Sequence, residues 1–138
     1  MRILAIDHGT VRMGIAVSDE LKMMAQPLCF IPAEPVSEFF TRLKEVLKTK
    51  DVGQIVVGMP RNMNGTYGPA SDKVNAFVQE LKTHTTLPIH LVDERLTSTQ
   101  ANRSLSQIGV RGKKKRENVD AAAAAIILQS FLDSPACQ

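Results

Sequence analysis

Hydrophobic residues fill two short stretches near the start of the chain, with a polar turn between them. Residues 3–6 form an apolar run that ends at Asp7, and a second run covers residues 15–17. An apolar run without alternation is typical of a strand covered on both faces, and Gly9 is typical of a turn. This pattern predicts a β-hairpin with a carboxylate at the end of a buried strand. A carboxylate there has to be paired, hydrogen-bonded or metal-bound.

The pattern farther along the chain predicts further strands and helices. Residues 24–31 predict a third strand, and Pro27 within it favours the edge of the sheet. Apolar residues recur at helical spacing from Val36 to Leu47, which predicts an amphipathic helix. The remaining expected elements are strands at residues 54–59 and 87–92, helices at about 69–81 and 97–108, and a last helix from about Asn118 to Leu132.

This order of elements predicts an α/β fold. Three antiparallel strands come first, and the alternation of helices and strands that follows adds parallel strands. We therefore expect a five-stranded mixed sheet with helices on both faces. The chain shows no internal repeat and no long linker, so we expect one domain over residues 1–138, with a disordered tail from about residue 133.

The composition indicates a soluble globular protein, because 43% of the residues are hydrophobic and 22% are charged. No run of about 18 apolar residues is present, and the N-terminus leads directly into a strand without a cleavage site. We therefore expect a cytoplasmic protein. Cys29 and Cys137 fit reduced thiols better than a disulfide or a metal framework.

Positive charge is concentrated in one segment. The net charge is +3, yet residues 111–116 hold five of the 17 basic residues, and without them the chain has 12 basic against 14 acidic residues. A cluster of this kind indicates phosphate contact at one place on the surface. The alternative, a solvated loop that keeps the protein soluble, fits the cluster equally well.

Three carboxylates fall where the predicted strands and helix could bring them together. Asp7 ends the first strand and Glu94 follows the fifth, so the two acids share a crevice if these parallel strands are neighbours. Asp120 lies in the first turn of the last helix, at the start of an apolar stripe that faces the sheet. Asp93 is a weaker candidate than Glu94, since adjacent strand residues point to opposite faces unless a bulge exchanges them.

Each acid also has a purely structural interpretation. Asp7 could hold its turn, Asp120 could complement the helix dipole, and Asp93 or Glu94 could pair with Arg95. We favour one site over three independent coincidences. An all-oxygen cluster without His or Cys suits Mg²⁺ or Mn²⁺. Two such ions about 4 Å apart would activate a water and stabilise the leaving oxygen of a phosphodiester.

Four motifs, in order along the chain, closely resemble the YqgF/RuvX family. They are Asp7-x-Gly9-x-x-Arg12-x-Gly14-x-Ala16, the Gly58-x-Pro60 turn with Asn62 and Gly65, the triplet Asp93-Glu94-Arg95, and Val119-Asp120 with the alanines and Ile127-Leu128-Gln129 that follow. The resemblance covers Met1 to about Leu132. It implies an RNase H-like fold related to the RuvC Holliday-junction resolvases.

The resemblance also implies an activity and a site. It implies a metal-dependent nuclease in which Asp7, Glu94 and Asp120 match the acidic positions of the family, with two ions bound when substrate is present. Family members are described as nucleases that process the 5′ end of precursor 16S ribosomal RNA, and also as Holliday-junction resolvases. His8 could take part in metal binding or proton transfer, but a side chain on the alternate face of the strand is favoured.

Basic and amide side chains are the candidates for contacting the nucleic-acid backbone. For Arg12, a structural salt bridge within the hairpin is an equal alternative. With one Tyr, five Phe and no Trp, the chain does not support stacking of many unpaired bases. The candidates are Arg12, Asn62, Asn64, Arg95, Arg111, Lys113, Lys114, Lys115 and Arg116.

Three other functions compete with rRNA processing. Resolution of branched DNA would need a symmetric dimer, whereas a monomer or weak homodimer is expected here. A nucleic-acid-binding module without catalysis would use the basic segment alone. An actin-like ATPase or sugar kinase has a similar Asp-x-Gly-Thr turn, but it needs two such domains, and 138 residues supply one.

Overall fold

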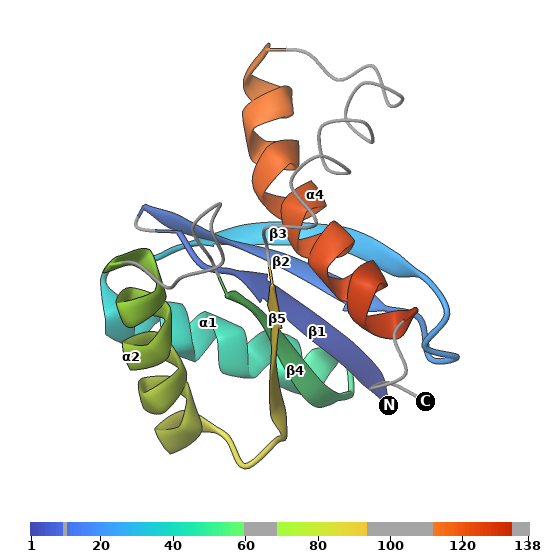
Figure 1. Cartoon of the computed structure of the whole chain (residues 1–138), viewed down its shortest axis with the longest axis horizontal. Coiled ribbons are helices and arrows are strands. Elements are labelled where there is room, and N and C mark those ends of the chain that lie inside the picture. The colour runs from blue at the N-terminus through green and yellow to red at the C-terminus, as the bar shows by residue number, and fades with distance from the viewer. Residues whose placement is uncertain (10, 60–68, 94–111, 134–138) are drawn as a thin grey trace.

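The computed structural model describes residues 1–9, 11–59, 69–93 and 112–133, and at residues 69, 70, 93 and 112–121 it describes the backbone alone. Within this part of the chain, five strands form one mixed sheet in the order β3-β2-β1-β4-β5 (Figure 1). The strands are β1 (Arg2–Asp7), β2 (Arg12–Ser18), β3 (Ala25–Pro32), β4 (Val52–Met59) and β5 (Ile89–Asp93).

Strand directions match the prediction. Strands β1 and β2 pair antiparallel, as do β2 and β3, while β4 is parallel to both β1 and β5. Pro27 lies in β3 at the edge of the sheet, as expected for a residue that cannot donate a backbone hydrogen bond. The antiparallel hairpin at the start of the chain is therefore confirmed.

Helices cover both faces of the sheet, as predicted. Helices α1 (Val36–Thr49) and α2 (Pro69–His84) lie on one face, and α4 (Gly112–Leu132) crosses the other (Figure 1). Pro69 opens α2, where its missing N–H costs nothing. In the described part of the chain, no helix is both long enough and apolar enough to cross a bilayer.

Alternate residues of β1 belong to two separate cores. Leu4 and Ile6 pack in the core under α1 and α2, together with Phe39. Ile3 and Ala5 pack in the core under α4. All four strand residues are fully buried, so side-chain alternation along β1 assigns each position to one helical layer.

The start of the last helix differs from the prediction. Helix α4 begins at Gly112 rather than near Asn118, so residues 113–116 form its first turns and not a loop. Lys and Arg are good helix formers, and no Gly or Pro interrupts residues 113–132. The start near Asn118 and the solvated loop are therefore wrong, and Asp120 lies inside α4 rather than in its first turn.

The first and fifth strands are not neighbours, although a shared crevice for Asp7 and Glu94 was expected only if they were. Strands β1 and β5 are parallel but are not neighbours, because β4 lies between them and pairs with both. Neighbouring strands are about 4.8 Å apart, so about 10 Å separates β1 from β5. The expected third helix at 97–108, the loop at 60–68 and the tail from 134 lie outside the described residues.

Candidate active site at the edge of the sheet

Asp7 is the last residue of β1 and continues the row of residues that faces α4. Ala5, two positions earlier, is fully buried in the core under α4. Asp7 pairs with Gly14 of β2, and because cross-strand partners share a face, the position beside Asp7 on that face carries no side chain. The carboxylate is partly buried at the carboxyl end of a central strand. In α/β sheets, ligand sites form at the carboxyl ends of the strands.

His8 lies on the opposite face from Asp7, as the alternation predicts. Its ring packs against Phe77 of α2 with the ring centroids 5.2 Å apart. Burial lowers the pKa of His8 below its usual value of 6.5, while the negative charge of Asp7 raises it and the positive charge of Lys73 lowers it further. The expected position of His8 on the alternate face of the strand is therefore confirmed.

Arg12 lies on the same face as Asp7, at the start of β2. Arg12, Gly14 and Ala16 are alternate residues of one strand, and Ala16 is buried in the core under α4. The guanidinium carbon of Arg12 lies 5.1 Å from the centroid of the Phe30 ring. Phe30 belongs to β3 and pairs with Gly14. This cation–π contact was missed from the sequence, because it depends on the register between two strands.

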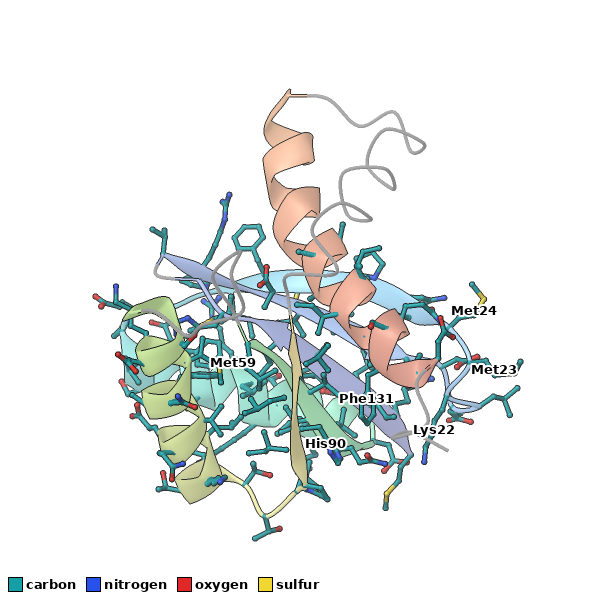
Figure 2. All side chains as sticks on the ribbon, viewed as in Figure 1. Lys22, Met23, Met24, Met59, His90 and Phe131 are labelled. Atoms are coloured by element: carbon teal, nitrogen blue, oxygen red, sulfur yellow. The ribbon has the colours of Figure 1, made fainter. Side chains whose placement is uncertain are left out.

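Even-numbered positions of β5 face α4. The His90 ring packs 5.0 Å from the Phe131 ring of α4 (Figure 2) and hydrogen-bonds Gln54 at 3.1 Å. Val92 packs against the core under α4, whereas Ile89 packs against the core under α1 and α2. This alternation fixes which face of β5 each position belongs to.

The three acids are described to different extents. The side chain of Asp7 is described. Only the backbone of Asp120 is described, and it lies in α4 one turn before the buried Ala124. Glu94 lies outside the described residues. Among the side chains that are described, no three His, Cys, Asp or Glu are grouped as metal ligands. Asn62, Asn64, Arg95 and Arg111 also lie outside, and residues 113–116 have a described backbone only.

Comparison with known proteins identifies the family. Residues 1–134 match the RuvX family, which is described as Holliday junction resolvase. The chain belongs to the RuvX family. This match spans nearly the whole sequence and confirms the resemblance seen in the four motifs.

Curated relatives match nearly the full length of this RuvX-family chain. A protein of Thermoanaerobacter pseudethanolicus (strain ATCC 33223 / 39E) is 42% identical over 135 residues, which cover 97% of each chain. A protein of Bacillus cereus (strain AH820) is 43% identical over 136 residues, which cover 97% of this chain and 99% of the relative. Both carry the name "Putative pre-16S rRNA nuclease".

Solved structures identify the fold of this RuvX-family chain. RuvC of T. thermophilus, in complex with a Holliday junction substrate, aligns with a TM-score of 0.57 at 18% identity, covering 95% of this chain and 93% of RuvC. The fowlpox virus resolvase, in complex with Holliday junction DNA, aligns with a TM-score of 0.58 at 11% identity, covering 96% and 97%. The fold is RNase H-like, as the resemblance implied.

Proposed function

We propose that this protein is a metal-dependent endonuclease that cleaves phosphodiester bonds in structured nucleic acid, with the 5′ end of precursor 16S ribosomal RNA as its substrate. One observation carries the proposal. In a RuvX-family chain whose relatives are named as pre-16S rRNA nucleases, Asp7 ends the central strand on the face that α4 covers. We place the reaction in the cytoplasm, where ribosomal RNA matures.

Alternation along the strands supports the grouping of Asp7, Glu94 and Asp120. Asp7 follows Ala5 on the α4 face, and position 94 would follow Val92 on that face if the alternation of β5 continues by one residue. Position 120 precedes the buried Ala124 by one helical turn on α4 itself. Asp7 and Asp120 therefore map to the same layer of the fold, and we propose that Glu94 joins them although β4 separates the two strands.

The donor set fits hard divalent cations. Three carboxylates without His or Cys offer the oxygen ligands that Mg²⁺ or Mn²⁺ prefers. We propose that Asp7, Glu94 and Asp120 would hold these ions. We favour Glu94 over Asp93 as the ligand, because adjacent strand residues point to opposite faces. Bound ions would supply charge stabilisation and an activated water at the scissile phosphate.

Arg12 would hold the nucleic-acid backbone beside the acids. It shares the α4 face with Asp7, and its contact with the Phe30 ring limits the positions that its guanidinium can occupy. A planar cation fixed in this way is suited to bidentate contact with a phosphate. Further backbone contacts are assigned to Asn62, Asn64, Arg95, Arg111, Lys113, Lys114, Lys115 and Arg116.

A second candidate function is cleavage of branched DNA. The description of the family as Holliday junction resolvase favours it. Paired symmetric cuts in a junction require two active sites related by a two-fold axis, and therefore a dimer. A monomer or weak homodimer, as expected from the sequence, suits RNA processing better.

Side-by-side cleavage assays test the proposal. A labelled precursor 16S RNA fragment and a four-way DNA junction are each incubated with Mg²⁺, with Mn²⁺ or with chelator. The wild type is compared with Asp7→Asn and with Asp51→Asn as the matched control. Asp51 is exposed and directly precedes β4, at the end of the strand opposite to the proposed site. Its φ is 52°, a conformation that Asn tolerates.

The outcomes separate the candidate functions. Metal-dependent cleavage of the RNA alone, lost in Asp7→Asn and kept in Asp51→Asn, is the expected result. Symmetric paired cuts in the junction would instead assign the protein to the resolvases. If both substrates are bound with or without metal and neither is cut, the protein is a binding module and the catalytic proposal is wrong.

A further inference from the structure

A cavity of about 500 Å³ lies on the face of the sheet opposite Asp7. It is bounded by the turn after β1, by the start of α1 and by α2. The floor contains the buried rings of Phe39, Phe40 and Phe77, and His8 lines the cavity near the edge of the sheet. This volume lies within the range of about 300–1,000 Å³ that is typical of small-molecule sites.

Charged side chains from separate elements surround the aromatic floor. Glu34 precedes α1, while Lys73 and Glu80 lie on α2, and all three are exposed and line the cavity. An aromatic floor with a few polar groups at the rim is the usual composition of a ligand site. Two carboxylates accept hydrogen bonds and the ammonium group of Lys73 donates them. The cavity therefore suits a molecule that carries both N–H donors and an acceptor on its edge.

The cavity reaches the end of β1, next to Asp7 in the chain. His8 and Gly9 line it, and His8 follows Asp7 directly in the chain. Consecutive Cα atoms are about 3.8 Å apart, and their side chains point to opposite faces of the sheet. A nucleotide that crosses this edge can place its phosphate on the Asp7 side and its base on the His8 side.

We propose that this cavity binds one unpaired nucleobase of the substrate strand, next to the cleaved phosphate, and that it prefers guanine. The inference rests on the proposed nuclease function and adds a base-recognition site to it. The edge of guanine carries the N1–H and N2–H donors that a carboxylate accepts, and the O6 acceptor that Lys73 would contact. Uracil carries one N–H between two carbonyl oxygens. Two carboxylates would repel these oxygens. Recognition of splayed-out bases by their Watson–Crick edges is the common mode of specific RNA binding.

A metal-free titration tests the cavity without any cleavage. Guanosine 5′-monophosphate and uridine 5′-monophosphate are added in chelator, and the ring signals of His8 and Phe77 are followed by NMR. We expect at least about tenfold tighter binding of the guanine nucleotide, because sites built around donor and acceptor pairs discriminate strongly. Equal binding of the two nucleotides, or no change in the ring signals, would contradict the proposal.

Paired variants locate the binding. Ala76 is exposed and lines the cavity, so Ala76→Leu fills it, whereas Gln79→Leu places the same side chain at an exposed α2 position that does not line it. We expect Ala76→Leu to abolish the guanine preference and Gln79→Leu to keep it. Glu80→Gln should likewise weaken the guanine preference, whereas Glu45→Gln, at an exposed position on α1, should keep it. A guanine preference that survives Ala76→Leu would place the binding elsewhere.

A third experiment distinguishes a substrate base from a free nucleotide. Single-stranded RNAs with one guanine at different positions are bound to Asp7→Asn in chelator and are cut by wild type with Mg²⁺. We expect tighter binding of guanine-containing RNA, and cuts at a fixed distance from the guanine that lose this register in Ala76→Leu. If free nucleotide binds but RNA binding and cut positions ignore guanine, the cavity is a free-nucleotide site and the proposal is wrong. If guanine tightens RNA binding but no RNA is cut, base recognition stands and the nuclease function fails.

Discussion

The guanidinium carbon of Arg12 lies 5.1 Å from the centroid of the Phe30 ring, although 18 positions separate the two residues. Gly14 makes this contact possible, because it pairs with Phe30 and leaves space on the face that Arg12 shares. The same glycine pairs with Asp7 on its other side. Phe30 therefore positions Arg12 on the face that holds the proposed catalytic carboxylate.

Replacing Phe30 is expected to weaken nucleic-acid binding. Phe30→Leu keeps an apolar side chain on β3 but removes the ring beneath Arg12. A cation–π contact is worth about 0.5–1 kcal/mol at exposed sites, so the dissociation constant should rise by about two- to fivefold. Fluorescence anisotropy of a labelled RNA in chelator measures the constant. Arg12→Lys should show a similar loss, because Lys keeps the charge but not the planar group. Unchanged affinity in Phe30→Leu would rule out a positioning role for the ring.

The turn after Asp7 is expected to tolerate no side chain at Gly9. A Cβ there would collide with the backbone carbonyl oxygen of Arg12, which cannot move without shifting the start of β2. Gly9→Ala should therefore lower the free energy of unfolding by about 1–3 kcal/mol. Cleavage should fall further, since this turn sets the distance between Asp7 and Arg12. Denaturant unfolding and the cleavage assay measure the two effects.

Gly53 supplies the matched control for this substitution. A Cβ at Gly53 would lie 2.6 Å from the Sδ atom and 2.9 Å from the Cβ atom of Met1, a residue that is 71% exposed and lies before β1. Met1 can shift as a whole without moving a strand, so Gly53→Ala should change neither stability nor cleavage by a comparable amount. Similar effects of the two substitutions would show that the turn geometry is not what matters.

Much of the sheet can be predicted from the sequence, and the reasons for the failures are physical. The hairpin, the edge position of Pro27 and the opposite orientation of Asp7 and His8 follow from local patterns of period two. The insertion of β4 between β1 and β5 depends on pairing between distant segments, which no local pattern encodes.

The contact between Arg12 and Phe30 illustrates the same limit. The ladder between β2 and β3 slips by one residue, since Ile15 pairs with Cys29 and Ala16 pairs with Pro27. A bulge of this kind sets which residues lie opposite one another, and the apolar sequence of β3 does not mark its position. The proposed site was predicted as a set of acids, whereas the aromatic residue that supports it was not.

Protonation of His8 is expected to lower the stability of the protein as the pH falls from neutral to mildly acidic. Burial lowers the pKa of His8 in the folded state below its usual value of 6.5. The unfolded chain therefore binds the proton more tightly, and stability is lost as the pH falls below about 6.5 and through the lowered pKa. Denaturant unfolding at pH 7 and pH 5 measures this loss.

A His8→Phe variant isolates this contribution. Phenylalanine keeps an aromatic ring against Phe77 but does not titrate. The decrease in stability from pH 7 to pH 5 should be smaller in His8→Phe than in the wild type, while carboxylates elsewhere contribute equally to both. An equal decrease in the two proteins would show that the protonation of His8 is not linked to folding.

Gln129 is expected to be the main polar connection between α4 and the β2–β3 turn. Its Oε1 accepts from the backbone N–H of Ala25 at 2.9 Å, and its Nε2 donates to the carbonyl oxygen of Met23 at 3.1 Å. Figure 2 shows Met23 and Met24 in this turn beside the C-terminal part of α4. Gln129→Leu removes both bonds and should cost about 1–2 kcal/mol of unfolding free energy. Gln79→Leu on the exposed side of α2 controls for the change of side chain and should cost less.

The basic residues at the start of α4 are expected to bind phosphates. Helix α4 has no acidic residue in its first turn, and Lys113, Lys114, Lys115 and Arg116 follow Gly112 there. Cations near a helix N-terminus oppose the helix dipole, so bound phosphates would relieve an unfavourable arrangement. Replacing the three lysines by Ala, a good helix former, should therefore weaken binding without disrupting α4.

Salt dependence separates phosphate contacts from a general charge effect. Each lost phosphate contact should reduce the magnitude of the negative slope of log K against log salt by about 0.7–0.9. If all three lysines bind phosphates, the triple substitution should reduce it by about 2–3. The control replaces three exposed lysines elsewhere by Ala and removes the same total charge; these are Lys44, Lys48 and Lys82. The control should leave the slope close to that of the wild type, because only direct neutralisation of phosphates releases their counterions. Equal slopes for the two triple variants would mean that net charge, rather than the start of α4, attracts the nucleic acid.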